Sequence, residues 1–310
     1  MRLLLHLILV SVAATVVLIA GGPGPARAQA AAPAVAPAPF QSARILIETR
    51  GPARGQGPDV VLIPGLASTS AVWTRTAAAL QDRYRVHLVT VRGFGDTAPG
   101  ANVEGLVGAP AAEEIRRYIE EQGLHRPALI GHSMGGQVAL RVAAEAGDRV
   151  GRVMVVDASP FFPSLISPGS TAADVEPLAR LAYQALLLLG DQVLRTQAAS
   201  MGLELGGAAD SLFDGLGWQG GDRRVLAQGL YEVMTTDLRA RLPLIAAPVT
   251  VVYGWSADDR SPRSQVDGLF RSGYRALRQP ASFERIEGAE HMVMIDRPRQ
   301  FQEAVERFLR

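Results

Sequence analysis

The chain has 310 residues, of which 48% are hydrophobic and 20% charged, a balance typical of a globular protein with a large core rather than a disordered one. Its formal net charge is only +1 at pH 7 and no basic run stands out, which argues against nucleic acid as a partner. The sequence contains neither cysteine nor lysine. Disulfides, thiolate zinc sites, cysteine nucleophiles and Schiff-base lysines are therefore excluded.

The N-terminal segment has the pattern of an export signal. Arg2 precedes an apolar run over residues 3–20, and small residues surround Arg27 further on, at Ala26, Ala28 and Ala30. We predict that residues 1–30 are a signal peptide, that the protein is exported to the periplasm or secreted, and that residues 31–43 form an Ala/Pro-rich tether. The alternative is an uncleaved membrane anchor, because the apolar run is long enough to span a bilayer.

From about residue 44 to residue 157, short apolar runs alternate with helical patterns. We expect strands at 43–48, 59–63, 85–91, 127–130 and 150–156, and helices at 71–82, 113–122 and 137–145. Strands that are apolar on both faces and alternate with helices are typical of a parallel sheet with helices on both sides.

The alternation is interrupted in the middle of the chain. Residues 160–240 are helix-like, rich in Leu, Ala and Gly, and show no clear strand pattern. The alternation then resumes, with strands expected at 248–253 and 282–286 and helices at 264–270 and 298–310. We therefore predict an α/β core over residues 44–160 and 241–310, with a mostly parallel sheet, and a helical cap inserted at 161–240.

The motif Gly131-His132-Ser133-Met134-Gly135 stands between an expected strand and an expected helix. A serine at such a junction occupies a sharp turn that only small neighbours fit, and the turn exposes its hydroxyl. With glycine this abundant the bare pattern can arise by chance, so its specificity comes from the flanking strand and helix. We predict that Ser133 is a nucleophile.

Of the five histidines, only His291 follows Ser133 in the sequence. It lies in the loop expected between the last strand and the last helix, and loops at the carboxyl ends of parallel strands are where such sheets place active sites. His132 adjoins Ser133, and neighbouring residues on such a turn point apart. We predict that His291 is the general base; the alternative is an ordinary surface histidine.

A third group must orient this imidazole and stabilise its charged form. Asp258 and Asp259 follow the strand expected at 248–253. We favour Asp258 as the acid, with Asp259 as the alternative. Asp157 ends another strand and is a rival, although a more ordinary role for it would be to fix its own loop.

The negative oxygen that develops during acyl transfer needs hydrogen-bond donors fixed in advance. Met134 follows the nucleophile and supplies one backbone amide. Leu66 follows Pro64-Gly65 at the end of an expected strand, where glycine lets the backbone approach closely. We predict an oxyanion hole formed by the amides of Leu66 and Met134; the alternative for Pro64-Gly65 is a simple chain turn.

Four motifs, in this order, resemble the α/β-hydrolase superfamily, in its capped serine esterase and lipase-like branch. They are IPGLASTSAVW at 63–73, VRGFG at 91–95, GHSMGG at 131–136 and GAEH at 288–291. The likeness covers residues 44–160 and 241–310. It implies a Ser–Asp–His triad, an oxyanion hole, and neither a cofactor nor a metal.

Two departures from the family pattern bear on the site. Members usually carry His-Gly where this chain has Pro64-Gly65, a change that should spare the amide of Leu66. The acid usually lies three residues beyond the glycine, whereas Asp258 lies four beyond Gly254, and this leaves the acid open. A serine at the turn argues against the dehalogenase and epoxide hydrolase branches, which use a carboxylate there.

The residues together predict a serine hydrolase that cleaves a carboxylic ester or lactone through an acyl-enzyme intermediate. The apolar cap stretch 178–189 could roof a pocket over Ser133, so we expect a small-molecule ester substrate with an apolar part. Candidate wall residues, which could instead only pack the cap onto the core, are Phe161, Phe162, Leu212, Phe213 and Trp218.

Two alternatives remain. An amide, peptide or carbon–carbon bond hydrolase could use the same triad, because the cap selects the substrate. A non-catalytic binder of apolar ligands could keep the fold, but the complete set of nucleophile, base and acid argues against it.

Overall fold

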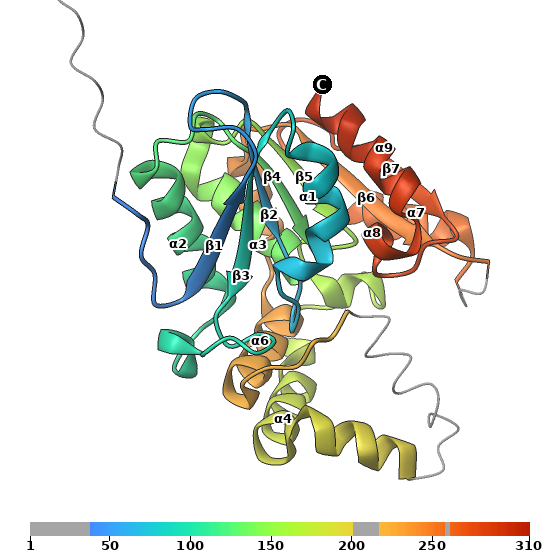
Figure 1. The fold of residues 1–310 in the computed structure, drawn as a ribbon. Helices are drawn as coiled ribbons and strands as arrows, with labels where there is room; N and C mark the ends of the chain where they lie inside the picture. The colour runs from blue at the N-terminus through green and yellow to red at the C-terminus, as the bar shows by residue number, and fades with distance from the viewer. Residues whose placement is uncertain (1–37, 201–216, 258–260) are drawn as a thin grey trace, which may run out of the picture. The chain divides into compact units, whose positions relative to one another are not determined.

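A seven-stranded sheet forms the centre of the computed structural model, which describes residues 38–200, 217–257 and 261–310 (Figure 1). The strands are β1 (Ile45–Arg50), β2 (Asp59–Ile63), β3 (Arg85–Val91), β4 (Ala128–His132), β5 (Arg152–Val156), β6 (Val249–Trp255) and β7 (Ser282–Glu287). Their order is β1-β3-β2-β4-β5-β6-β7; β1 pairs antiparallel with β3, and the other pairs are parallel. The predicted α/β fold with a mostly parallel sheet is confirmed.

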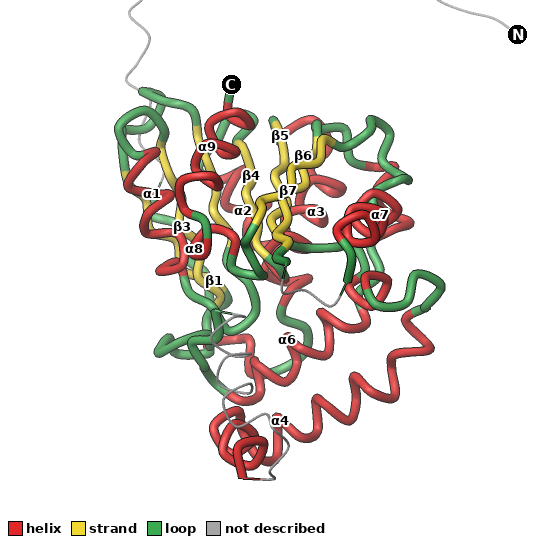
Figure 2. The backbone as a smooth tube through the Cα atoms, turned by 90° about the vertical axis from the view of Figure 1, so that its right-hand side faces the viewer, coloured by secondary structure: helices red, strands yellow, loops and turns green. Residues whose placement is uncertain are grey.

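Helices cover both faces of the sheet because the central strands are apolar on both sides. In β4, Leu129 packs into one buried cluster, whereas Ala128 and Ile130 pack into the other, as the two-residue period of a strand requires. Figure 2 shows α1, α8 and α9 on one side of the strands and α3 and α7 on the other. The helices outside the stretch between β5 and β6 are η1 (Ser70–Trp73), α1 (Thr74–Leu80), η2 (Gly100–Val103), α2 (Gly108–Glu121), α3 (Met134–Ala146), η3 (Gly147–Arg149), α7 (Arg263–Gly273), α8 (Val293–Asp296) and α9 (Pro298–Leu309).

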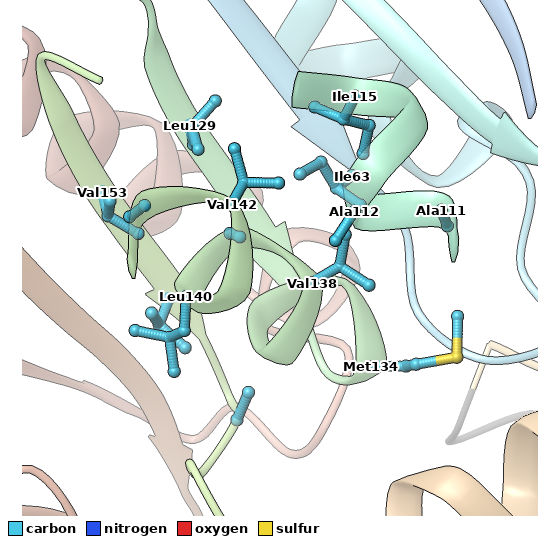
Figure 3. Packing of buried hydrophobic residues seen from close by; sticks show 14 of the residues in the cluster. Ile63, Ala111, Ala112, Ile115, Leu129, Met134, Val138, Leu140, Val142 and Val153 are labelled. Atoms are coloured by element: carbon cyan, nitrogen blue, oxygen red, sulfur yellow. The ribbon is translucent and has the colours of Figure 1, made fainter. Parts of the chain in front are cut away.

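The packing of α3 fixes the end of β4. Val138 and Val142 lie one helical turn apart and belong to the same buried cluster as Leu129 of the sheet and Ile115 of α2 (Figure 3). Burying each such aliphatic side chain contributes roughly 1.5–3 kcal/mol relative to leaving it exposed. The strand and the helix on either side of residue 133 are thus both anchored in the core.

Between β5 and β6, the structure describes four helices joined by loops, and no strand among the described residues. These helices are η4 (Phe162–Leu165), α4 (Ala172–Ser200), α6 (Arg223–Thr235) and η5 (Arg239–Leu244), and α4 is kinked at Gly190, which has φ 73°. Figures 1 and 2 both place α4 and α6 beyond one end of the sheet. This agrees with the helical character expected of residues 161–240, whereas the exact limits of the cap stay a prediction.

Helix α2 begins at Gly108, earlier than the expected residue 113, and a contact from the inserted region explains the difference. The buried carboxylate of Glu232, on α6, accepts hydrogen bonds from the amides of Val107 (2.5 Å) and Gly108 (3.0 Å). These amides stand at the start of α2, where helices leave donors unpaired. Burial raises the pKa of this carboxyl, although the amide hydrogen bonds act in the opposite direction. The helix start is therefore completed by a residue more than a hundred positions away.

The predicted signal peptide at 1–30 and the tether up to residue 37 lie outside the described residues, so export stays a prediction. Within the described ranges, no helix has the length and apolar character needed to cross a membrane.

Candidate active site

Ser133 stands at the junction of β4 and α3 in a conformation that few residues other than glycine adopt. Its φ is 52° and its ψ −123°, and its amide donates a 2.9 Å hydrogen bond to the carbonyl of Val156 at the end of β5. Such strained backbone persists only where the surroundings hold it, and it concentrates at functional sites. The residue is 9% exposed, so the turn presents a hydroxyl that is mostly shielded from bulk water.

Gly135 lets the turn pack against the end of β2. A β-carbon at Gly135 would collide with the carbonyl oxygens of Ile63 and Pro64, both of them backbone atoms. The neighbouring chain cannot give way by rotating a side chain, so the glycine is required for the two segments to approach.

We expect Gly135→Ala to lower the free energy of unfolding by about 1–3 kcal/mol, the usual cost of overpacking a core. Gly268→Ala is the matched control, because Gly268 lies inside α7 with nothing within 4 Å of an added β-carbon. There alanine should raise the free energy of unfolding by about 0.5–1 kcal/mol, through its higher helix propensity. Urea unfolding measures both, and equal shifts in the two variants would contradict this account.

His291 lies between β7 and α8, and its partner is Asp157. Nδ1 of His291 is 2.7 Å from Oδ2 of Asp157, and both side chains are about one-fifth exposed, at 21% and 18%. The other carboxylate oxygen of Asp157 accepts a 3.1 Å hydrogen bond from the amide of Gly254. Since the carboxylate accepts, Nδ1 carries a proton and Nε2 of the neutral ring is left as the free base.

This contact differs from the expectation for the acid. Asp258 and Asp259, the predicted acid and its alternative, lie outside the described residues, and the carboxylate that reaches His291 belongs to Asp157, the rival that we had expected only to fix its own loop. The strand order gives the physical reason: β5 lies directly beside β4, so the residue that ends β5 lies beside the turn that carries Ser133. Asp157 itself has φ 45°, which directs the chain away from the strand at this point.

The loop that carries His291 is held by the end of β6. A β-carbon on Gly254 would lie 2.6 Å from the carbonyl oxygen of Ala289, so glycine allows the loop to approach. The amide of Gly288 donates to the carbonyl of Trp255 (2.7 Å), and the amide of Glu290 donates to Asp296 (2.9 Å). The imidazole is therefore carried by a loop with fixed backbone on both sides.

His132 links this loop to the nucleophile turn, a role that the sequence did not suggest. It is fully buried, its Nε2 lies 2.9 Å from the carbonyl oxygen of His291, and the two rings lie 4.6 Å apart. Burial, and then the neighbouring charge of His291, hold the pKa of His132 well below its usual value. His132 is thus neutral, donates from Nε2, and brings the turn of Ser133 to the loop of His291.

The predicted oxyanion amides lie on the two segments that meet at Ser133. Met134 is the first residue of α3, and Leu66 follows Gly65, where an added β-carbon would lie only 3.1 Å from the β-carbon of Ser133. In the described part of the chain, neither amide has an acceptor. Two free donors beside one hydroxyl are what an oxyanion hole requires.

A cavity of about 330 Å³ opens beside His291 and Asp157. It is walled by Leu165 and by the α7 side chains Val266, Leu269 and Phe270, while Ser133 is not among its lining residues. Of the wall residues that we had considered, Phe161 is fully buried and Phe162 and Trp218 pack against the core, whereas Leu212 and Phe213 lie outside the described residues. Among those described, no group of three or more His, Asp or Glu is placed to hold a metal ion.

Comparison with known proteins agrees with this fold. The model of the family described as "Alpha/beta hydrolase family" matches residues 60–304. The pimeloyl-[acyl-carrier protein] methyl ester esterase of Aeromonas hydrophila is 32% identical over 261 residues, which are 82% of this chain and 96% of that protein. The protein of the same name from Vibrio cholerae is 30% identical over 207 residues, which are 64% of this chain and 76% of that one.

A solved structure has the same fold. The enol-lactonase from Burkholderia xenovorans LB400 superposes with a TM-score of 0.64 at 20% sequence identity, covering 86% of this chain and 96% of that one. At this identity the likeness concerns the fold alone.

Proposed function

Because this chain belongs to the alpha/beta hydrolase family, we propose that it is a serine hydrolase that cleaves a carboxylic ester or lactone with an apolar part. The observation that carries the proposal is the 2.7 Å contact between His291 and Asp157 on a loop tied to the strained turn of Ser133. Esterase names among the relatives favour ester bonds over amide bonds.

The proposed reaction proceeds in two stages. Oγ of Ser133 attacks the ester carbonyl while Nε2 of His291 takes the hydroxyl proton, and the amides of Leu66 and Met134 stabilise the oxyanion. His291 returns the proton to the departing alcohol, which leaves an acyl-enzyme. Water, deprotonated by His291, then attacks the acyl-enzyme and releases the acid, and Ser133 regains its proton. Throughout, Asp157 stabilises the imidazolium form of His291.

The substrate class follows from the surroundings of His291 and Asp157. Leu165 and three side chains of α7 form an apolar wall of the 330 Å³ cavity beside His291, so we propose a small-molecule ester whose apolar part lies against α7. The names of the relatives specify a methyl ester carried by an acyl-carrier protein; the class proposed for this chain is broader.

We expect short p-nitrophenyl esters to be hydrolysed with a burst of one nitrophenolate per active site, followed by slower deacylation. Stopped-flow absorbance measures the burst, and a panel of ester and amide versions of one acyl group measures bond preference. Faster cleavage of the amides would favour the amide or peptide hydrolase. Absence of both turnover and fluorophosphonate labelling in folded protein would support the non-catalytic binder.

A further inference from the structure

Residues 217–222, here called the return segment, belong to the inserted region. They lead into α6 and contact residues 65–70, here called the oxyanion loop. The amide of Gln219 donates to the carbonyl of Ala67 (2.7 Å), and the buried hydroxyl of Ser68 donates to the carbonyl of Gly217 (2.7 Å). The loop that supplies the amide of Leu66 is therefore bonded to the inserted region through a backbone carbonyl and a side-chain hydroxyl.

The oxyanion loop needs such support because its conformation is strained. The amide of Ser68 donates to the carbonyl of Gly65 across a turn, and Ala67 inside this turn has φ 56°. This region favours glycine, and alanine stays in it only where neighbouring groups hold it there. Ala67 directly follows Leu66, so a change at Ala67 would redirect the amide of Leu66.

Gln219 contacts this strained residue and the residue two positions after it. Its Oε1 accepts from the amide of Thr69 (2.8 Å) and from the hydroxyl of Thr69 (2.7 Å), while its own amide binds Ala67. The same hydroxyl caps η1 by accepting from the amide of Ala71 (3.3 Å). One side chain thus fixes the loop two residues after Ala67 and one residue before η1 begins.

The other end of the return segment is fixed to the core independently. The amide of Gly95 donates to the carbonyl of Gly220 (2.9 Å), and the amide of Asp222 donates to the carbonyl of Gly93 (2.8 Å). The return segment therefore bridges the loops that follow β2 and β3. Because the loop after β3 holds it in place, the return segment can support the oxyanion loop.

We propose that the return segment positions the oxyanion hole, with Gln219 as a positioning residue that orients the amide of Leu66 by holding the turn at Ala67. The inference rests on the proposed function. It places a determinant of the reaction rate in the inserted region, outside the motifs that supply the nucleophile, the base and the acid.

The test compares three variants with p-nitrophenyl butyrate as substrate. Gln219→Ala should lower kcat about tenfold with KM changed less than about twofold, since a misdirected donor weakens binding of the transition state more than of the ester. Gln219→Glu keeps an acceptor oxygen and should restore most of kcat. Gln300→Ala is the matched control, because Gln300 is an exposed glutamine on α9 that makes no side-chain hydrogen bond among the described residues.

A trifluoromethyl ketone separates positioning from folding, because Ser133 converts it to a hemiketal whose oxygen enters the oxyanion hole. Its Ki should rise about tenfold in Gln219→Ala, and this rise should shrink in the Ala67→Gly background, where the turn needs less support. Equal Ki values in Gln219→Ala and Gln300→Ala, or a rise that Ala67→Gly leaves unchanged, would overturn the inference. Lack of ester hydrolysis in the unaltered protein would instead overturn the proposed function.

Discussion

Ser133→Ala is expected to lower kcat for p-nitrophenyl butyrate about 10⁴- to 10⁶-fold, which is the loss seen when a serine nucleophile is removed from a triad. Without Oγ no acyl-enzyme forms, and the burst of nitrophenolate should vanish with the steady-state rate. Stability should change little, because alanine meets the same backbone strain at φ 52° and the hydroxyl does not cap α3. Steady-state kinetics and a thermal melt measure the two effects.

Ser272→Ala provides the control for this variant. Ser272 is an exposed serine of α7 whose hydroxyl, within the described ranges, bonds only to the carbonyl of Leu269, so its loss should leave kcat and the burst unchanged. A Ser133→Ala protein that keeps the unaltered rate would refute the nucleophile assignment. Fluorophosphonate labelling adds an independent readout, since the probe should react with the Ser272→Ala protein and not with Ser133→Ala.

Local patterns were sufficient to predict the α/β fold and to propose Ser133 and His291. The turn of Ser133 is specified by the residues next to it. They are glycines at which an added β-carbon would collide with backbone atoms, an apolar strand before the turn and a helix with an apolar face after it. His291 could be predicted because the loops that follow parallel strands lie together at one edge of the sheet. These features depend on short stretches of chain and on a topological rule.

The carboxylate that contacts His291 and the supporting contacts depend on which strands become neighbours, which no short stretch specifies. Asp157 looked like an ordinary strand end. The order β4-β5-β6-β7 places it between the turn of Ser133, after β4, and the loop of His291, after β7. The start of α2 was missed because its cap, Glu232, comes from α6. No sequence pattern marks Gln219, because its role depends on the fold placing the return segment beside Thr69.

Asp157→Asn is expected to lower kcat about 10⁴-fold with a small change in KM, as when an amide replaces the acid of a serine triad. The amide nitrogen would favour the wrong tautomer of His291, and no negative charge would stabilise the imidazolium that forms as Ser133 loses its proton. The folded structure should persist, because asparagine keeps the acceptor oxygen that binds the amide of Gly254. Steady-state kinetics with p-nitrophenyl butyrate measure the loss.

The decisive comparison is with Asp258→Asn and Asp259→Asn, measured with the same substrate and expected to retain kcat within a few-fold. If Asp157 acts only through His291 and Ser133, adding Asp157→Asn to Ser133→Ala should cause no further loss, because residues that act as a unit are not additive. A large loss in Asp258→Asn together with near-normal Asp157→Asn would return the role of acid to the loop after β6. The 2.7 Å contact of Asp157 would then serve only to place the ring of His291 in the resting enzyme. Among Asp157, Asp258 and Asp259, the residue whose replacement by asparagine lowers kcat most is therefore the one that stabilises the charge developing on His291.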